Sequence, residues 1–349
     1  MRQRREAVRA WMAREGLDAL LVSSRPNVRY LTGFAGEGLL VIDGGELICT
    51  DSRYCVQAAE EAPGIDCVAE GGHLEQAIER LRATGATRIG FRGQDLSYAN
   101  WRTLSDKLEG AELVACDGEI ERLRAVKDET EIALIARAAQ VADAAFAQWR
   151  GWLQPGVSER EAALELERLM VLAGADKASF EVIVAGGPNA AKPHAAPGTR
   201  AIRAGELVVV DWGASVEGYC SDCTRTVILG EPDQRQREIW QAVRAAQQAA
   251  LAVVRPGAAC REVDEVAREA LRAAGWEKQF GHGLGHGVGL QVHEPPSLSQ
   301  KSEDVLAPGM VVTIEPGVYI EGWGGVRLEE LVLVTQEGCQ ALTGAPYDL

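Results

Sequence analysis

The sequence predicts an α+β protein of two domains: an N-terminal α/β domain over residues 1–122 and an internally duplicated C-terminal domain over 123–349. At 349 residues the chain exceeds the length at which a single hydrophobic core stops growing. Strand-like and helix-like segments alternate in its first third, which is typical of an α/β unit. After residue 123, two pairs of helix-like segments recur with equal spacing, and strand-like segments follow each pair.

The N-terminal domain is predicted from short periodic segments. In chain order we expect a helix over 2–15, a strand over 18–24, a hairpin over 39–50, a strand over 88–91 and a helix over 99–110. Tyr30–Phe34 is expected to form a surface loop. This domain contains no cluster of chemically active residues, so the function is sought in the second domain.

Two helices are expected at the start of the C-terminal domain. Asp128 and Glu131 form a capping-box pattern, which opens a helix that ends near Trp149. A second helix is expected from Ser158 to Gly174.

The same arrangement returns 101 residues later, with helices over about 234–254 and up to Gly275. Strands are expected after each pair, over 180–185, 207–229, 311–320 and 326–334. We infer two helix–helix–sheet halves related by a pseudo-two-fold axis, with a crevice between them that suits a ligand. The alternative is a coincidence of Pro-Gly pairs, which commonly end helices.

Composition and charge exclude several classes of function. Hydrophobic residues make up 46% and charged residues 25% of the chain, as in ordinary globular proteins. The formal net charge of −15 disfavours nucleic-acid binding. No apolar run approaches the length of a membrane span, and the N-terminus lacks the apolar core of a secretory signal.

Eight cysteines without framework spacing predict reduced thiols and a cytoplasmic location. Cys220 and Cys223 form a C-x-x-C pattern, which indicates strand packing or, alternatively, a redox motif.

Histidines gather in one part of the sequence. Four of the five lie in a window of one hundred residues that also holds Asp211 and Asp222: His194, His282, His286 and His293. Imidazole is both the commonest metal ligand and the usual proton shuttle near neutral pH. We therefore predict a metal site there, the alternative being polar residues on solvated glycine-rich turns.

The spaced carboxylates support this prediction. Asp211 directly follows four apolar residues, and a carboxylate in an apolar strand is costly without a cation or a partner. The alternative is a buried aspartate paired with Arg225 or Arg203. In the second half, Glu315 follows an apolar run and Glu329 lies at the start of one.

Glu330 is the alternative to Glu329 as the fourth carboxylate of this site. Strand alternation places Glu329 on the face of Arg327 and turns Glu330 to the other face, although the pattern alone leaves open which face is inward. Residues 281–289 hold five glycines in nine positions, so this segment can approach other backbone closely while it presents its histidines.

Four carboxylates and one imidazole suit two divalent cations. An oxygen-rich set favours Mn²⁺ or Co²⁺, with Zn²⁺ as an alternative. Two such ions about 3.5–4 Å apart would share a bridging water and lower its pKa toward neutrality. Histidines outside the ligand set could then hold the scissile carbonyl and the developing oxyanion.

Several stretches of the chain resemble the pita-bread metallopeptidases of the Xaa-Pro group, aminopeptidase P and prolidase. The matching segments are 180–197, 208–226, 281–296, 313–320 and 325–330. Upstream, NVRYLTGF and DSRYCVQAAEE resemble the creatinase/prolidase N-terminal domain. The resemblance implies that residues 123–349 form a pita-bread catalytic domain.

The resemblance also implies the roles of individual residues. The implied metal ligands are Asp211, Asp222, His286, Glu315 and Glu329. The implied catalytic residues are His194, His293 and Glu315, and the implied substrate contacts are His282, Tyr319 and Arg327. The expected cofactors are two divalent ions, Mn²⁺ first, and the expected partners are proline-containing peptides and further copies of the chain in a homodimer or larger homo-oligomer.

The expected reaction is cleavage of an N-terminal Xaa-Pro bond by a metal-bridging hydroxide. Prolidases of this kind often carry an arginine where this chain has Ser297, and that arginine can hold a dipeptide's carboxylate. The sequence therefore favours an Xaa-Pro aminopeptidase, with an Xaa-Pro dipeptidase as the alternative. A remote alternative is a non-catalytic interaction module of the same fold.

Overall fold

The computed structural model describes residues 1–349 and divides the chain into two units, Met1–Arg124 and Ala125–Leu349. The first unit is built on a six-stranded mixed sheet of order β4-β3-β2-β1-β5-β6, as the alternating segments predict. Its strands are β1 (Ala19–Val22), β2 (Leu39–Ile42), β3 (Glu46–Cys49), β4 (Asp66–Val68), β5 (Arg88–Phe91) and β6 (Glu112–Ala115). Its helices are α1 (Arg2–Glu15), α2 (Arg25–Thr32), α3 (Cys55–Glu61), α4 (His73–Thr84), α5 (Tyr98–Lys107) and α6 (Glu119–Ala125), the last of which runs into the second unit.

The prediction of a surface loop at Tyr30–Phe34 is wrong. These residues lie at the end of α2 and just after it, and Leu31 and Phe34 are fully buried. The helix is only eight residues long and has a proline in its first turn, where proline's fixed φ is tolerated. So short a segment offers little periodicity, and its apolar residues are explained by the core of this unit.

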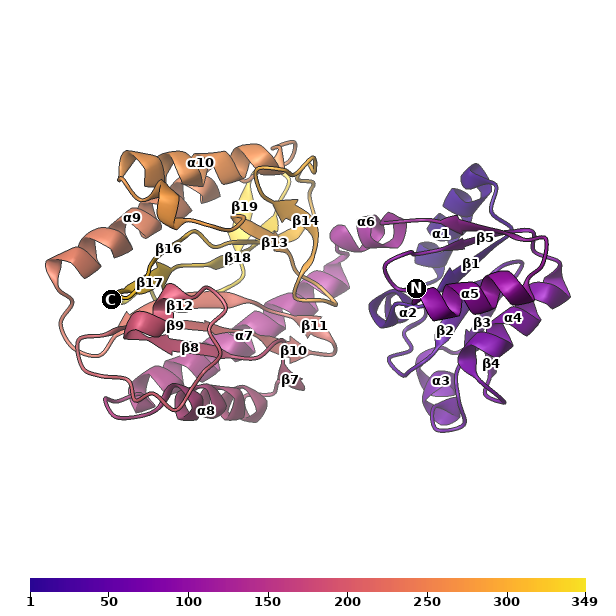
Figure 1. Cartoon of the computed structure of the whole chain (residues 1–349), viewed down its shortest axis with the longest axis horizontal. Helices are drawn as coiled ribbons and strands as arrows, with labels where there is room; N and C mark the ends of the chain where they lie inside the picture. Colours follow the sequence, from indigo (N-terminus) through magenta and orange to yellow (C-terminus); the bar gives the residue numbers. More distant parts are fainter. The chain divides into compact units, whose positions relative to one another are not determined.

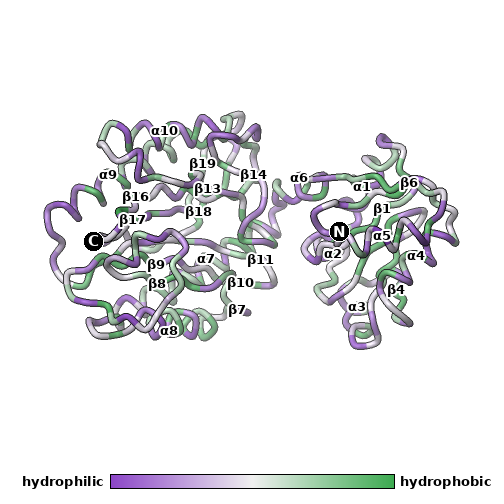
Figure 2. Tube along the Cα trace, in the orientation of Figure 1, coloured by the Kyte–Doolittle hydropathy of each residue, from purple (hydrophilic) through white to green (hydrophobic).

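The second unit contains the internal duplication that the sequence predicts. Its helices are α7 (Glu129–Trp152), α8 (Glu159–Leu172), α9 (Gln234–Leu251) and α10 (Cys260–Ala273). Both α8 and α10 have 14 residues, and their bounds differ by 101 positions. The capping box of Asp128 and Glu131 is present as predicted. Hydrophilic and hydrophobic residues are mixed along α9 and α10 (Figure 2). None of the helices combines the length and the apolar character that a membrane span requires.

The strands of each half follow its helix pair and lie between α8 and α10 (Figure 1). In the first half β12-β9-β8 and β11-β10-β7 form two three-stranded sheets, and in the second half β14-β13-β15-β18-β19 and β16-β17 form sheets of five and two strands. The first-half strands are β7 (Lys177–Ala178), β8 (Ile183–Gly186), β9 (Leu207–Trp212), β10 (Ala214–Val216), β11 (Tyr219–Cys220) and β12 (Cys223–Ile228). The second-half strands are β13 (Gly285–Gly287), β14 (Glu294–Leu298), β15 (Val311–Ile314), β16 (Gly317–Ile320), β17 (Gly324–Arg327), β18 (Glu330–Val334) and β19 (Cys339–Ala341). Two short 3₁₀ helices, η1 (Gly187–Ala191) and η2 (Glu277–Gln279), complete the unit.

An aromatic stack ties β9 to α7. The rings of Phe146 and Trp212 lie 4.2 Å apart, and Trp212 donates a hydrogen bond to the Ala142 carbonyl. Trp212 is fully buried, and successive side chains of a strand point to opposite faces. Asp211 is therefore directed away from α7, toward the second half.

The glycine-rich segment approaches other backbone closely, as the sequence predicts. A Cβ atom on Gly285 would lie 2.0 Å from the Thr313 carbonyl oxygen, so β13 can pair with β15 only because this position is glycine. None of the eight cysteines is in a disulfide bond, and the C-x-x-C pair Cys220 and Cys223 is buried on strands.

Candidate metal centre

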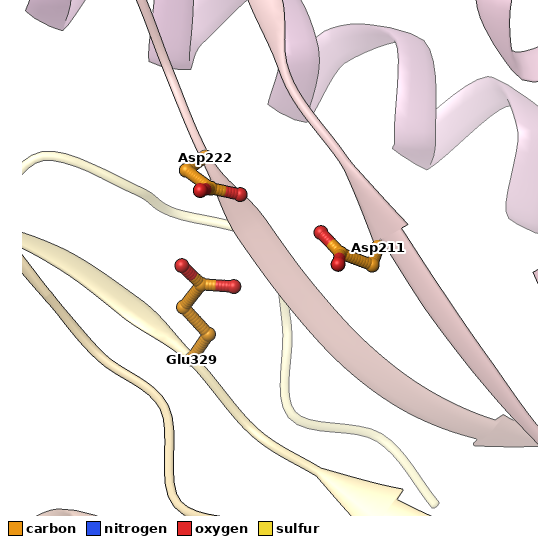
Figure 3. A group of neighbouring side chains, drawn as sticks. All are labelled: Asp211, Asp222 and Glu329. Atoms are coloured by element: carbon orange, nitrogen blue, oxygen red, sulfur yellow. The ribbon is translucent and has the colours of Figure 1, made fainter. Parts of the chain in front are cut away.

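Three carboxylates from the two halves converge on one point (Figure 3). Asp211 lies on β9, Asp222 just before β12 and Glu329 just before β18. One oxygen atom from each lies within 4.8 Å of the others. Asp222 and Glu329 are almost fully buried, so three anionic groups share a site from which water is largely excluded.

Strand register brings these acids together. Asp211 pairs with Thr224 across β9 and β12, and Ile314 pairs with Glu330 across β15 and β18. Glu330 turns to the opposite face from Glu329, as strand alternation predicts, and forms an ion pair of 2.8 Å with Arg225. The alternative pairing of Asp211 with Arg225 or Arg203 is wrong in its partner, because Asp211 pairs with Arg327.

Asp211 and Glu329 each have one carboxylate oxygen that accepts a hydrogen bond and one that does not. Thr224 Oγ1 donates to Glu329 Oε2 at 2.8 Å, and Arg327 Nη2 donates to Asp211 Oδ2. The remaining oxygens, Asp211 Oδ1 and Glu329 Oε1, are buried without a hydrogen-bond partner. Burial, and then mutual repulsion, raises the pKa of Asp222 and of Glu329 well above the ordinary range of a carboxyl. Buried acceptors that have no donor fit a cation site.

His286 and Glu315 extend the cluster. The Nε2 atom of His286 lies 3.2 Å from Glu315 Oε1 and 3.6 Å from Asp222 Oδ2. Its Nδ1 atom is 3.1 Å from the Gly287 carbonyl, which can only accept, so Nδ1 carries the proton of a neutral ring. The Nε2 lone pair then faces two carboxylates. That arrangement requires a proton or a cation between them, and a backbone-anchored Nδ1–H is typical of metal-binding histidines.

A hydrogen-bonded chain connects His282, Tyr319 and Arg327. Arg327 Nη1 donates to the Tyr319 hydroxyl, which lies 3.0 Å from His282 Nε2. Burial lowers the pKa of His282, so the neutral ring accepts from Tyr319. Arg327 also bonds Asp211, Thr224 and the Pro193 carbonyl. The side chain of Arg327 thus makes four hydrogen bonds to other residues of the chain. We infer that it mainly holds the carboxylate cluster in place.

Two cavities of about 260 Å³ each meet at the cluster. Both are lined by His194, His286, His293, Glu315 and Arg327. The first also has the apolar walls Phe180, Ile183 and Val292, and the second includes His282 and Ser297.

His194 and His293 are solvent-exposed at these cavities, unlike the buried carboxylates. The ring of His293 lies 4.3 Å from that of His286, and burial lowers the pKa of His293. All of the residues that the sequence singles out thus lie in one site, with the acids inside and two imidazoles at the opening.

Comparison with known proteins identifies the family. Residues 133–336, more than half of the chain, match metallopeptidase family M24, and residues 4–126 match the creatinase/prolidase N-terminal domain. This chain belongs to metallopeptidase family M24. The expected order of a creatinase/prolidase-type domain followed by an M24 domain is therefore confirmed.

Relatives of this M24 chain resemble it over its full length. It is 36% identical over 351 residues to an Xaa-Pro dipeptidase of Pyrococcus furiosus, and the match covers 100% of both chains. A solved Xaa-Pro dipeptidase of Bacillus anthracis superimposes with a TM-score of 0.95 at 37% identity, covering 99% of this chain and 98% of that one. A solved X-Pro aminopeptidase of Thermotoga maritima has a TM-score of 0.88 at 34% identity, covering 96% of this chain and 98% of that one.

The sequence analysis missed two threonines of the M24 site. Thr224 donates to Glu329, and Thr313 donates to Glu315 at 3.0 Å while it accepts from the His286 backbone. Thr224 and Thr313 each lie two residues from a predicted acid at the end of the same strand, Asp222 and Glu315 respectively, and extended backbone turns both side chains to the same face. That spacing could have identified them as hydrogen-bond donors to the cluster.

A buried arginine supports the M24 site from behind. Arg225 is about 1% exposed, pairs with Glu330 and donates to the Glu329 and Ala345 carbonyls. Its guanidinium also lies 3.9 Å from the ring centroid of Tyr347. The segment that carries Glu329 is thus fixed to the C-terminal residues.

Replacing Arg225 with methionine is expected to lower the free energy of unfolding by about 3 kcal/mol, because Glu330 is left buried without its cation. Chemical denaturation followed by circular dichroism measures this change. The matched control, Arg168→Met, breaks an exposed pair with Glu165 and is expected to change stability by less than about 1 kcal/mol. Equal effects of the two variants would contradict the supporting role of Arg225.

Proposed function

We propose that this M24 peptidase hydrolyses the bond between a first residue and a following proline, with Xaa-Pro dipeptides as its main substrates. The observation that carries the proposal is the cluster of buried, partly unpartnered carboxylates beneath two exposed histidines. The names of the full-length relatives, in which Xaa-Pro dipeptidase recurs, support the choice of substrate.

The proposed metal ligands are Asp211, Asp222, His286, Glu315 and Glu329. Oxygen donors dominate this set and no thiolate belongs to it, so Mn²⁺ is the proposed ion, with Co²⁺ and Zn²⁺ as alternatives. Divalent cations bound there supply Lewis acidity at the scissile carbonyl and lower the pKa of the attacking water.

The remaining steps belong to side chains of the protein. Glu315 Oε1 accepts from Thr313 and faces His286, which leaves Oε2 to take up the proton of the attacking water. His194 and His293, at the opening, donate hydrogen bonds to the carbonyl oxygen as negative charge develops on it. His282 and Arg327 line the second cavity. The Tyr319 hydroxyl lies between them and hydrogen-bonds both side chains.

A second candidate function is that of an Xaa-Pro aminopeptidase, which the sequence analysis favours. Ser297 lines the second cavity, where an arginine would hold a dipeptide's carboxylate. The only cation among the lining residues of that cavity is Arg327, which is engaged by the chain. The relatives nevertheless support the dipeptidase better, so the aminopeptidase stays the alternative.

We expect the manganese-loaded protein to cleave Ala-Pro with a higher kcat/KM than Ala-Pro-Ala, and to lose activity with both after chelation. Ala-Ala serves as the control for proline selectivity. A higher kcat/KM for the tripeptide would favour the aminopeptidase. Failure to cleave either proline peptide with bound metal would overturn the proposed function.

We further propose a cytoplasmic location and a homodimeric state for this enzyme. Cysteines without disulfide bonds are consistent with a reducing compartment, and the oligomeric state is proposed from the family resemblance alone. Light scattering of the purified protein measures the number of subunits.

A further inference from the structure

Glu159 is a buried carboxylate outside the metal centre. It is the first residue of α8, where acidic residues are usually exposed and act on the helix dipole. Its neighbour Glu161 is exposed and closes the capping box with Ser158, whereas Glu159 is 0% exposed. A carboxylate buried this deeply is costly unless donors surround it.

The donors to Glu159 all come from one loop. Its Oε1 accepts from the Gly186 N–H at 2.9 Å, and its Oε2 accepts from the Gly198 N–H at 3.2 Å. The Asn189 amide donates to both oxygens at 3.0 Å. Gly186 and Gly198 are the two ends of the segment that contains His194, so a single carboxylate closes this loop at its base.

The position of His194 depends on the backbone of this loop. Its ring forms no hydrogen bond of its own and is exposed at both cavities. The Arg327 guanidinium holds the adjacent Pro193 carbonyl at 3.0 Å. The loop is thus fixed at its ends by Glu159 and near its middle by Arg327, and His194 projects from between these anchors.

The second half holds its own histidine loop in a related way. Asp264 on α10 is 0% exposed, accepts from the Leu284 N–H at 2.9 Å and pairs with Arg268. Arg268 in turn donates to the His282 carbonyl. In both halves, therefore, a buried acid on the second helix holds the loop that carries a histidine.

We propose that Glu159 is a positioning residue that holds His194 where it can reach the scissile carbonyl. The inference rests on the proposed function, in which His194 acts on that carbonyl. It assigns Glu159 no contact with substrate or cations. Its loss should therefore lower kcat through His194 and leave metal content unchanged.

Glu159→Gln is the decisive variant, because it keeps the shape of the side chain but replaces one accepting oxygen with an NH₂ group. That group cannot accept a hydrogen bond from the N–H donors of the loop. We expect kcat to fall between about tenfold and 10²-fold with KM changed less than about threefold, as a displaced catalytic group predicts. Glu161→Gln, in the same helical turn, is the matched control and is expected to retain kcat. Asn189→Ala removes donors from the loop side and is expected to have a smaller effect in the same direction.

Two measurements separate this inference from the proposed function. Hydrogen exchange of peptides spanning 186–198, followed by mass spectrometry, needs no turnover, and it should speed up at least about tenfold in Glu159→Gln but not in Glu161→Gln. In a double-mutant cycle with His194→Ala, Glu159→Gln should have little further effect on kcat.

Unchanged exchange, or additive losses in kcat, would overturn the role of Glu159. Faster exchange in a protein whose wild type cleaves no Xaa-Pro peptide would support the clamp on the loop and overturn the proposed function instead.

Discussion

Asp222→Asn is expected to reduce Xaa-Pro hydrolysis by at least about 10³-fold, because it would remove one of the proposed carboxylate ligands and several kcal/mol of charge stabilisation with it. It should also stabilise the metal-free protein. Burial and the neighbouring Glu329 and Asp211 raise the pKa of Asp222, so the ionised group is a strain on the metal-free fold. Because the pKa of Asp222 is raised in the folded state, the wild type loses stability as the pH rises through that pKa. The asparagine variant cannot ionise there and should lose less stability over the same pH range.

Manganese content after dialysis and thermal melting with and without Mn²⁺ measure both effects. Each hundredfold loss of affinity removes roughly 2.7 kcal/mol of cation-induced stabilisation. Glu181→Gln is the matched control, because Glu181 is an exposed carboxylate on the wall of the same cavity and lies outside the cluster. If Asp222→Asn still bound two ions, the assignment of Asp222 as a ligand would be wrong.

His194→Ala is expected to retain its metal and to lose between about 10²-fold and 10³-fold in kcat/KM. The ring lies at the cavity opening, outside the group of carboxylates, so its removal leaves the ligands in place. It would take away a donor that acts as negative charge develops on the carbonyl oxygen, and removing one such donor usually costs this much. Steady-state kinetics on Ala-Pro and metal analysis of the same sample provide the measurement.

His73→Ala is the control for the histidine substitution. His73 lies in the N-terminal unit, 3.4 Å from Asp51, and its loss is expected to leave turnover unchanged. A parallel loss of metal and activity in His194→Ala would instead assign His194 to the cation site.

The carboxylate cluster was predictable because burying charge is expensive. Asp211 and Glu315 each follow a run of apolar residues, where a carboxylate requires compensation that sequence inspection can recognise. Helix starts were predictable for a similar reason, since the capping box of Asp128 and Glu131 is complete within four residues. Signals of this kind are local and depend on the type of residue.

Other features have no such signal. Glu159 has the appearance of any acid in a first helical turn, because its partners are backbone N–H groups 27 and 39 residues away, which every sequence contains. The buried ion pair of Lys127 and Glu294 has no local signal either, because its two residues lie far apart in the sequence. The preference for an aminopeptidase depended on Ser297 alone, and one missing arginine is weak evidence about which substrate is cleaved.

The two halves contribute unequal shares of the proposed ligands, and neither share is sufficient. Asp211 and Asp222 precede the exposed connection at 230–231, whereas His286, Glu315 and Glu329 follow it. A chain cut at that connection would give two inert fragments, each with an incomplete ligand set. Recovered peptide cleavage on mixing them would then be a direct signal of reassembly, which makes this domain suitable for a split-enzyme reporter.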